Sequence, residues 1–185
     1  MTRLVLASRS PQRKAILEQL GIEFTVEVPD VEELDSGPPH EVALENAYRK
    51  AQAVAPARRE ALVLGVDTVV ALGSRIYGKP TGAGQARQTL LALSGRRHAV
   101  VSGLCLVDAG RGRTAATTTI VEFRPLDEWM IGWYLASEEW RDRAGGYAIQ
   151  GRGAALIDRI EGDYSNVVGL PVSTLLTLAP GLLRG

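Results

Sequence analysis

The stretch that most restricts the fold is ALVLGVDTVVAL, residues 61–72, the most apolar run in the chain. A continuous apolar run of this kind is typical of a central strand that is covered on both faces. Gly65 and Asp67 are its two interruptions. Because an unpartnered carboxylate is costly to bury, we expect Asp67 to face a ligand, a metal ion or a water molecule. The alternative is an aspartate that caps a neighbouring turn. Thr68 should point to the opposite face of the strand.

A second apolar run opens the stretch LVLASRSPQRKAIL, residues 4–17, and predicts a strand that passes directly into a helix. Such a turn presents free backbone N–H groups and the positive end of the helix dipole, which suits a phosphate. Ser8 and Ser10 add hydroxyl donors, and Arg13 adds a bidentate cation. In the alternative interpretation Ser10 only caps the helix and Arg13 and Lys14 form a solvated face. The turn lacks the glycine pattern of a Walker loop.

The remaining pattern alternates strands and helices and then forms a hairpin. IEFTVEV, residues 22–28, alternates strictly and predicts a half-buried strand, and residues 41–55 form a helix with an alanine face. Residues 98–107 and 114–123 are two strands joined by the turn DAGRGR. This order predicts an α/β fold with a mixed sheet, and the length predicts a single domain over residues 1–185.

Composition excludes several classes of function. Lys plus Arg and Asp plus Glu both number 21, so we expect no nucleic-acid partner and no membrane partner. No window approaches the ~20 apolar residues of a membrane span, and we expect a cytoplasmic protein. Cys105, the single cysteine, lies in an apolar run and should be a buried thiol. His40 and His98 have no neighbouring cysteine or serine elbow, so neither a zinc site nor a catalytic triad is indicated.

Four further polar positions are weaker candidates. Lys79 projects from a rigid Gly-Lys-Pro turn, and Lys50 lies on the alanine-faced helix, although solvated lysines are the commoner case. Glu33, the second of two adjacent loop glutamates, could help to hold a hard divalent cation, or the loop could simply be solvated. Gln150 lies in the glycine-rich stretch AGGYAIQG, where its amide would suit the edge of a base.

Together these motifs resemble a known family. LVLASRSPQRKAILEQLGIEF, VEE, RKA, GVDTVV, GKP, LSGRRHAVVSGL, VEFRPL, AGGYAIQG and VVGLP occur in the order and spacing seen in Maf-like nucleoside triphosphate pyrophosphatases. The resemblance runs from about Leu4 to about Pro171. It implies a mixed twisted sheet flanked by helices, with two lobes and a cleft, similar to inosine triphosphate pyrophosphatases. It also implies a cytoplasmic enzyme that releases pyrophosphate from a nucleoside triphosphate with a divalent cation, Mg²⁺ or Mn²⁺, and that can form a homodimer.

The resemblance also assigns roles to single residues. Asp67 matches the proton acceptor of the family, and with Glu33 it would hold the metal ion. The positions that would bind the triphosphate are Ser8, Ser10, Arg13, Lys50 and Lys79.

Three positions would select the base. The branch that acts on dTTP and UTP typically shows Arg, Thr and Gln at the positions of Gln12, Thr68 and Gln150, whereas the branch that acts on 7-methyl-GTP shows Trp, Gln and Glu. Thr68 and Gln150 favour the first branch, and Gln12 departs from both. The alternatives are a 7-methyl-GTP pyrophosphatase, a nucleotide-binding regulator of septum formation with little catalysis, and a phosphohydrolase that cuts at the γ phosphate.

Overall fold

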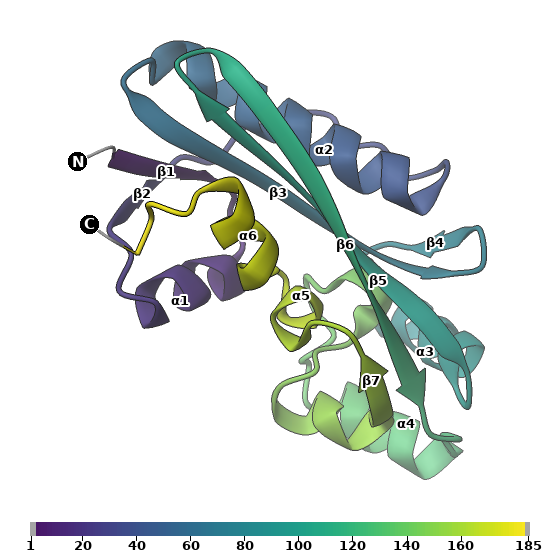
Figure 1. Cartoon of the computed structure of the whole chain (residues 1–185). Coiled ribbons are helices and arrows are strands. Elements are labelled where there is room, and N and C mark those ends of the chain that lie inside the picture. Colours follow the sequence, from purple (N-terminus) through teal and green to yellow (C-terminus); the bar gives the residue numbers. More distant parts are fainter. Residues whose placement is uncertain (1–2, 184–185) are drawn as a thin grey trace.

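The computed structural model describes residues 3–183 and has one seven-stranded sheet at its centre (Figure 1). The strand order is β2-β1-β3-β5-β6-β7, and β4 also pairs with β3. β1 is parallel to β2 and β3, while the later pairs are antiparallel, so the predicted mixed α/β sheet is confirmed. The strands are β1 (Arg3–Ala7), β2 (Phe24–Val26), β3 (Ala61–Leu72), β4 (Arg75–Tyr77), β5 (Arg97–Asp108), β6 (Arg111–Phe123) and β7 (Ile157–Glu161).

Helices flank this sheet at different places along its length. α2 packs against β3 and β5, and α1 and α6 contribute side chains to a cluster that covers the opposite face beside β1 (Figure 1). α3 and α4 lie at the far end of the long strands. The helices are α1 (Pro11–Gln19), α2 (Pro39–Val54), α3 (Ala83–Leu93), α4 (Glu128–Leu135), α5 (Tyr164–Val168) and α6 (Val172–Leu178). Within residues 3–183, none of these helices has the length and apolar character needed to cross a membrane.

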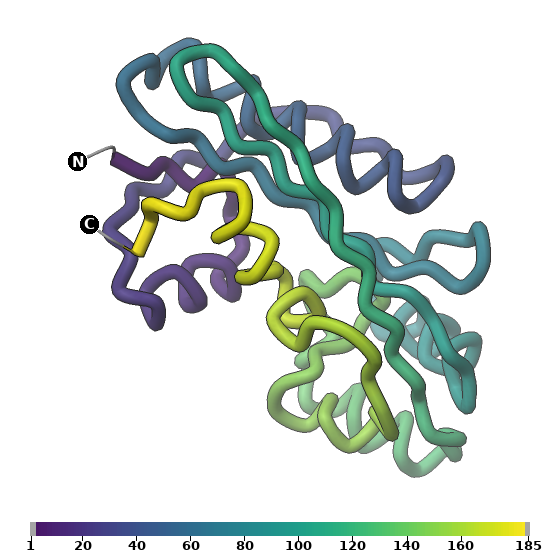
Figure 2. Tube along the Cα trace, in the orientation of Figure 1, coloured from purple at the N-terminus to yellow at the C-terminus, as the bar shows by residue number. Residues whose placement is uncertain are grey.

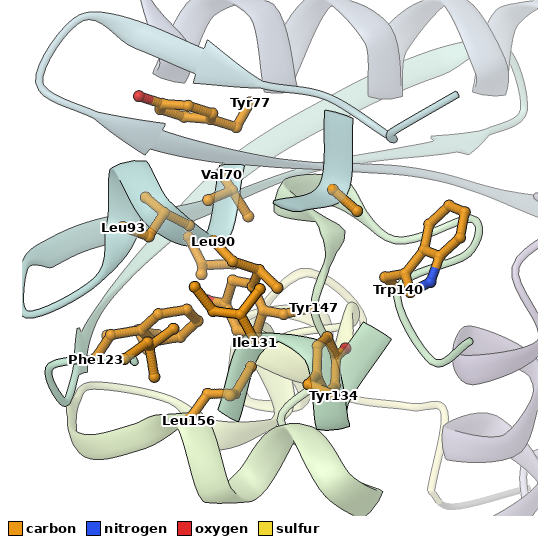
Figure 3. Close-up of a cluster of buried hydrophobic side chains, with 14 residues drawn as sticks. Val70, Tyr77, Leu90, Leu93, Phe123, Ile131, Tyr134, Trp140, Tyr147 and Leu156 are labelled. Atoms are coloured by element: carbon orange, nitrogen blue, oxygen red, sulfur yellow. The ribbon is translucent and has the colours of Figure 1, made fainter. Parts of the chain in front are cut away.

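The core is divided between two lobes that share the long strands. In the first lobe, Leu17 of α1 and Leu175 of α6 pack with the start of β1 and β3, and α2 covers the other face. In the second lobe, aromatic and branched side chains from β3, α3, α4 and the following loop meet around Leu90 and Phe123 (Figure 3). Figure 2 shows β5 and β6 running without interruption through both lobes.

Two glycines let α2 approach the sheet closely. An added Cβ on Gly65 would lie 2.7 Å from the backbone nitrogen of Ala51, and one on Gly103 would lie 2.6 Å from that of Leu44. Gly103 also pairs with Asp67 across the β3–β5 ladder. The glycine in the apolar run is therefore a packing requirement, and it sets the distance between α2 and Asp67.

Two predicted elements differ from the structure. Only Phe24–Val26 of residues 22–28 form a strand, because β2 lies at the edge of the sheet and pairs with three residues of β1. Val26 and Val28, expected to be buried, are 45% and 51% exposed. The hairpin turn is also shorter than expected, since Ala109 and Gly110 alone connect β5 to β6, both with positive φ.

Candidate functional site

The site begins at a gap in the sheet. β5 occupies one edge of β3 along Val63–Ala71. On the other edge β1 pairs as far as Gly65, and β4 begins to pair at Val70. Residues 66–69 therefore have no strand partner on that edge among the described residues, and Asp67 and Thr68 lie in the gap. Ligand sites in α/β proteins occur at this kind of position, beyond the carboxyl end of a parallel strand.

A cleft of about 720 Å³ opens at this gap and is lined by both lobes. The first lobe contributes the β1–α1 turn, the loop after β2, α2, β3 and the end of α5. The second lobe contributes Lys79 and the loop of residues 141–150. All ten residues singled out from the sequence line this cleft: Ser8, Ser10, Gln12, Arg13, Glu33, Lys50, Asp67, Thr68, Lys79 and Gln150.

Asp67 is buried at the floor of the cleft, on the α2 face of β3. Its Oδ1 lies 2.6 Å from Lys50 Nζ, and its Oδ2 accepts a hydrogen bond of 3.1 Å from Asn46 Nδ2. Lys50 Nζ also lies 3.0 Å from Glu33 Oε2. Lys50 is 7% exposed, so it does not belong to a solvated helix face. One ammonium thus holds two carboxylates together and offsets part of their negative charge in a partly dehydrated site.

Asn46 fixes the loop that carries Glu33. Its Oδ1 accepts a hydrogen bond of 2.7 Å from the backbone N–H of Leu34, and its Nδ2 donates to the carbonyl of Leu34 at 2.9 Å. The side chain is 1% exposed. Asn46 and Lys50 are four residues apart, so they lie on the same face of α2. The loop carboxylate and the strand carboxylate are therefore brought together by one helix face.

Arg13 occupies the opposite face of β3 and is almost fully buried. Its Nε donates to the Gly169 carbonyl at 2.9 Å, its Nη1 to Ser8 Oγ at 2.9 Å and its Nη2 to Thr68 Oγ1 at 3.2 Å. Thr68 Oγ1 also lies 2.8 Å from Ser102 Oγ. Burial lowers the pKa of Arg13, while the charges of the two cleft carboxylates raise it. The expected opposite orientation of Thr68 and Asp67 is confirmed, and Arg13 is not a solvated residue.

The turn before α1 keeps its first helical N–H groups available. Ser10 stands at the N-cap position, but its hydroxyl makes no capping bond. It donates instead to Gln12 Oε1 at 3.0 Å, and its backbone N–H donates to Ser8 Oγ at 3.2 Å. The simple capping role of Ser10 is therefore wrong. Lys14, by contrast, is a surface residue that lies 3.6 Å from Glu18.

The second lobe forms the other wall of the cleft. Lys79 is exposed and lies two residues after the end of β4, and Gln150 is exposed at the end of the glycine-rich loop. Tyr147 anchors this loop, because its hydroxyl lies 2.8 Å from Nε2 of the buried His98. Burial lowers the pKa of His98 to about 4, so the imidazole is neutral at pH 7.

The residues that the family resemblance assigns to the site line one cleft. A sequence profile of the family also matches this chain. The profile of the family described as Maf-like protein matches residues 3–181. The chain belongs to this family.

Several curated relatives of this Maf-like protein are named dTTP/UTP pyrophosphatase. The relative from Symbiobacterium thermophilum is 45% identical over 93% of this chain and 90% of its own length. The relative from Gloeobacter violaceus is 45% identical over 95% of this chain and 94% of its own length. The relative from Pyrococcus furiosus is 41% identical over 96% of this chain and 94% of its own length. The crystal structure of protein VC0702 from Vibrio cholerae matches with a TM-score of 0.41 at 10% identity, over 75% of this chain and 69% of that one.

Sequence reasoning missed some residues of this Maf-like site. Asn46 does not stand out in the sequence, because polar residues are common on helices. Its spacing of four residues from Lys50 does indicate that the two side chains lie on the same helix face. Ser102 and the Gly169 carbonyl contact Thr68 and Arg13 from distant parts of the chain. No local pattern could have indicated either contact.

Proposed function

We propose that this Maf-like protein hydrolyses dTTP and UTP to the corresponding monophosphate and pyrophosphate. One observation carries the proposal: the predicted phosphate-binding, acid–base and base-reading residues line a single cleft, with a buried carboxylate and lysine at its floor. The names of relatives at 41–45% identity support the same reaction.

The triphosphate would bind between the two walls. The open first turn of α1 offers backbone N–H groups, and Ser8 and Ser10 offer hydroxyls. Arg13 holds Ser8 and Thr68 in place and adds positive charge behind them. Lys79 adds a cation from the other wall. Such fixed donors stabilise the charge that moves onto the leaving pyrophosphate during phosphoryl transfer.

Asp67 would take the proton from the attacking water. Asp67 lies at the floor of the cleft, and Lys50 and Asn46 hold its carboxylate in one orientation. A water molecule beside this carboxylate would therefore be positioned to attack the α phosphorus. The water forms the new P–O bond, its proton passes to Asp67, and the bond to the bridging α–β oxygen breaks. Pyrophosphate leaves with the bonding electron pair.

The same carboxylates fit a divalent cation. No group of three or more His, Cys, Asp and Glu side chains converges among residues 3–183, so a metal ion held by protein alone is not indicated. Mg²⁺ in nucleotide sites commonly binds one or two carboxylates together with substrate phosphates and water. Glu33 and Asp67, both within 3.0 Å of Lys50 Nζ, are the pair that would hold it. When bound, the cation would polarise the phosphate and neutralise developing charge.

Two residues would favour a pyrimidine base. Gln150 is exposed in the cleft, where its amide offers both a donor and an acceptor to a base edge. Thr68 is held between Arg13 and Ser102. Gln12 is neutral and is bonded to Ser10, so it contributes no charge to the anion site.

Product analysis tests the reaction. Purified protein is incubated with dTTP and Mg²⁺, or Mn²⁺, and the products are separated by ion exchange. We expect dTMP and pyrophosphate in equal amounts. Formation of dTDP and inorganic phosphate would show cleavage at the γ phosphate instead. A rise in melting temperature with dTTP but no pyrophosphate release would indicate a nucleotide-binding regulator.

A further inference from the structure

The cations of the cleft differ in how their charges are used. Arg13 donates to three protein oxygens, and Lys50 is shared by Asp67 and Glu33. These two side chains organise the site, but their donors are largely occupied before a substrate arrives. A triphosphate carries several negative charges, so it needs cations whose donors are still available.

Arg143 is such a cation. It lines the cleft from the second lobe and is half-buried, and its guanidinium makes no hydrogen bond or ion pair with any residue in the described part of the chain. Burial lowers its pKa, although Tyr134, Glu139 and Asp142 raise it. A partly dehydrated guanidinium with unused donors is unfavourable unless a ligand supplies acceptors. This residue is not explained by the folding of the loop.

The backbone around Arg143 is fixed against the rest of the second lobe. The N–H of Gly145 donates to the carbonyl of Gly78 at 3.1 Å, and that of Gly146 donates to the carbonyl of Arg143 at 3.0 Å. An added Cβ on Gly145 would lie 2.9 Å from the side chain of Val70, so the loop packs tightly against β3. Because Gly78 precedes Lys79, the two cations project from adjoining segments of one wall.

We propose that Arg143 binds the β and γ phosphates of the substrate, the part that leaves as pyrophosphate. The inference rests on the proposed function. Most of the negative charge of a triphosphate lies on these two groups, and the planar guanidinium can contact two phosphate oxygens at once. Arg143 and Lys79 line the second-lobe wall of the cleft that has Asp67 and Lys50 at its floor. Arg143 and Lys79 thus add contacts to the leaving group from the second lobe, while the first lobe supplies the donors of the β1–α1 turn and the reacting carboxylate.

Arg143→Gln tests this assignment, with Arg152→Gln as a charge-matched control. Arg152 lies just after the loop that carries Arg143, in the short 3-10 helix Gly151–Leu156 and outside the cleft, with its guanidinium 5.4 Å from the centre of the Trp133 ring. The measurements are the kcat and KM for dTTP, and the melting shifts caused by pyrophosphate alone and by dTMP alone. Arg143→Lys is added because lysine restores the charge but not the two-point contact.

We expect Arg143→Gln to raise the KM for dTTP at least about tenfold, because the loss of one charge-assisted hydrogen bond to phosphate corresponds to a change of this size. It should also weaken the pyrophosphate-induced shift, with the dTMP-induced shift unchanged and Arg143→Lys intermediate. Arg152→Gln should match the wild type. If the wild type hydrolyses dTTP while Arg143→Gln keeps its KM and pyrophosphate shift, the Arg143 assignment is overturned and the proposed function stands. If the wild type releases no pyrophosphate from dTTP but Arg143→Gln loses the pyrophosphate shift, the proposed function fails and the anion site remains.

Discussion

Asp67 is the residue whose chemistry the proposed reaction needs most directly. In the sequence it is an acid in an apolar strand, and in the structure it pairs with the Lys50 ammonium and accepts a hydrogen bond from Asn46. Asp67→Asn keeps the shape but removes the proton acceptor. We expect kcat for dTTP to fall at least ~100-fold, the usual contribution of a general base. The readout is pyrophosphate release.

The exposed Asp158 supplies a matched control, since Asp158→Asn makes the same chemical change outside the cleft. It should retain the wild-type rate. Near-normal turnover by Asp67→Asn, with the same dTTP-induced melting shift, would remove Asp67 from the mechanism.

His98 gives the protein a predictable pH dependence of stability. Its imidazole is 2% exposed and its pKa falls from 6.5 to about 4 on folding. The unfolded chain therefore binds this proton at a higher pH than the folded chain does, and the free energy of unfolding falls as pH decreases through that interval. Between pH 7 and pH 5 the loss from this one group is about 2 kcal/mol.

Urea unfolding at pH 7 and pH 5 measures this effect in the wild type, His98→Gln and His40→Gln. Glutamine can still bond to the hydroxyl of Tyr147 but does not titrate, so His98→Gln should lose this part of the pH dependence. His40 is exposed, and His40→Gln should keep it. An equal pH dependence in the wild type and His98→Gln would contradict the assignment.

The site residues found from the sequence are those whose type conflicts with their local pattern. Asp67 is a charged residue in an apolar strand, and Ser8 and Ser10 place hydroxyls in a turn between two core elements. Asn46 and Arg143 conflict with nothing local, since polar residues are ordinary on helices and in loops. Asn46 is distinguished by its contacts with Leu34 and Asp67, and Arg143 by its place in the cleft, and both features depend on segments far away in the chain.

At the scale of elements, the packing of α2 on β3 decides whether the carboxylate and the lysine meet. Gly65→Ala would place a methyl group 2.7 Å from the backbone nitrogen of Ala51, so α2 must shift. We expect the free energy of unfolding to fall by about 1–3 kcal/mol, the typical cost of overpacking. The activity toward dTTP should fall as well, because Lys50 moves away from Asp67.

Gly112→Ala is the matched control on the same face of the sheet. Its added Cβ would lie 3.8 Å from Gln52 Nε2 and 3.9 Å from Cys105 Sγ, which are ordinary contacts. Urea unfolding should show a change below about 1 kcal/mol. Equal stability and activity in Gly65→Ala and the wild type would show that α2 does not need this close approach.

Long elements were predictable from sequence because their pattern repeats. The central strand, the hairpin strands and the alanine-faced helix all occur in the structure. The alternation over residues 22–28 predicts a longer strand than β2, because alternation does not show how few residues of an edge strand find a partner. The sequence predicts a longer hairpin turn than the structure has, because the arginine and glycine residues at the start of β6 are residue types typical of loops.

In the molecule as a whole, the cleft exists because β3 has two successive partners, β1 and then β4, on the same edge. β1 ends its pairing at Gly65 and β4 starts at Val70, so β3 is open between the lobes. The order of helices and strands predicted a mixed sheet, but pairing on a particular edge is not encoded in local periodicity. The two-lobed arrangement was therefore expected from the family resemblance rather than from the pattern of elements.

A comparison of substrates tests the proposed preference for dTTP and UTP. Pyrophosphate release is measured with dTTP, UTP and 7-methyl-GTP under the same Mg²⁺ concentration, and kcat/KM is compared. Because Thr68 and Gln150 line the cleft and match the residue types that the family resemblance gives for the pyrimidine branch, we predict values for dTTP and UTP at least about tenfold above that for 7-methyl-GTP. Equal or faster hydrolysis of 7-methyl-GTP would contradict the account.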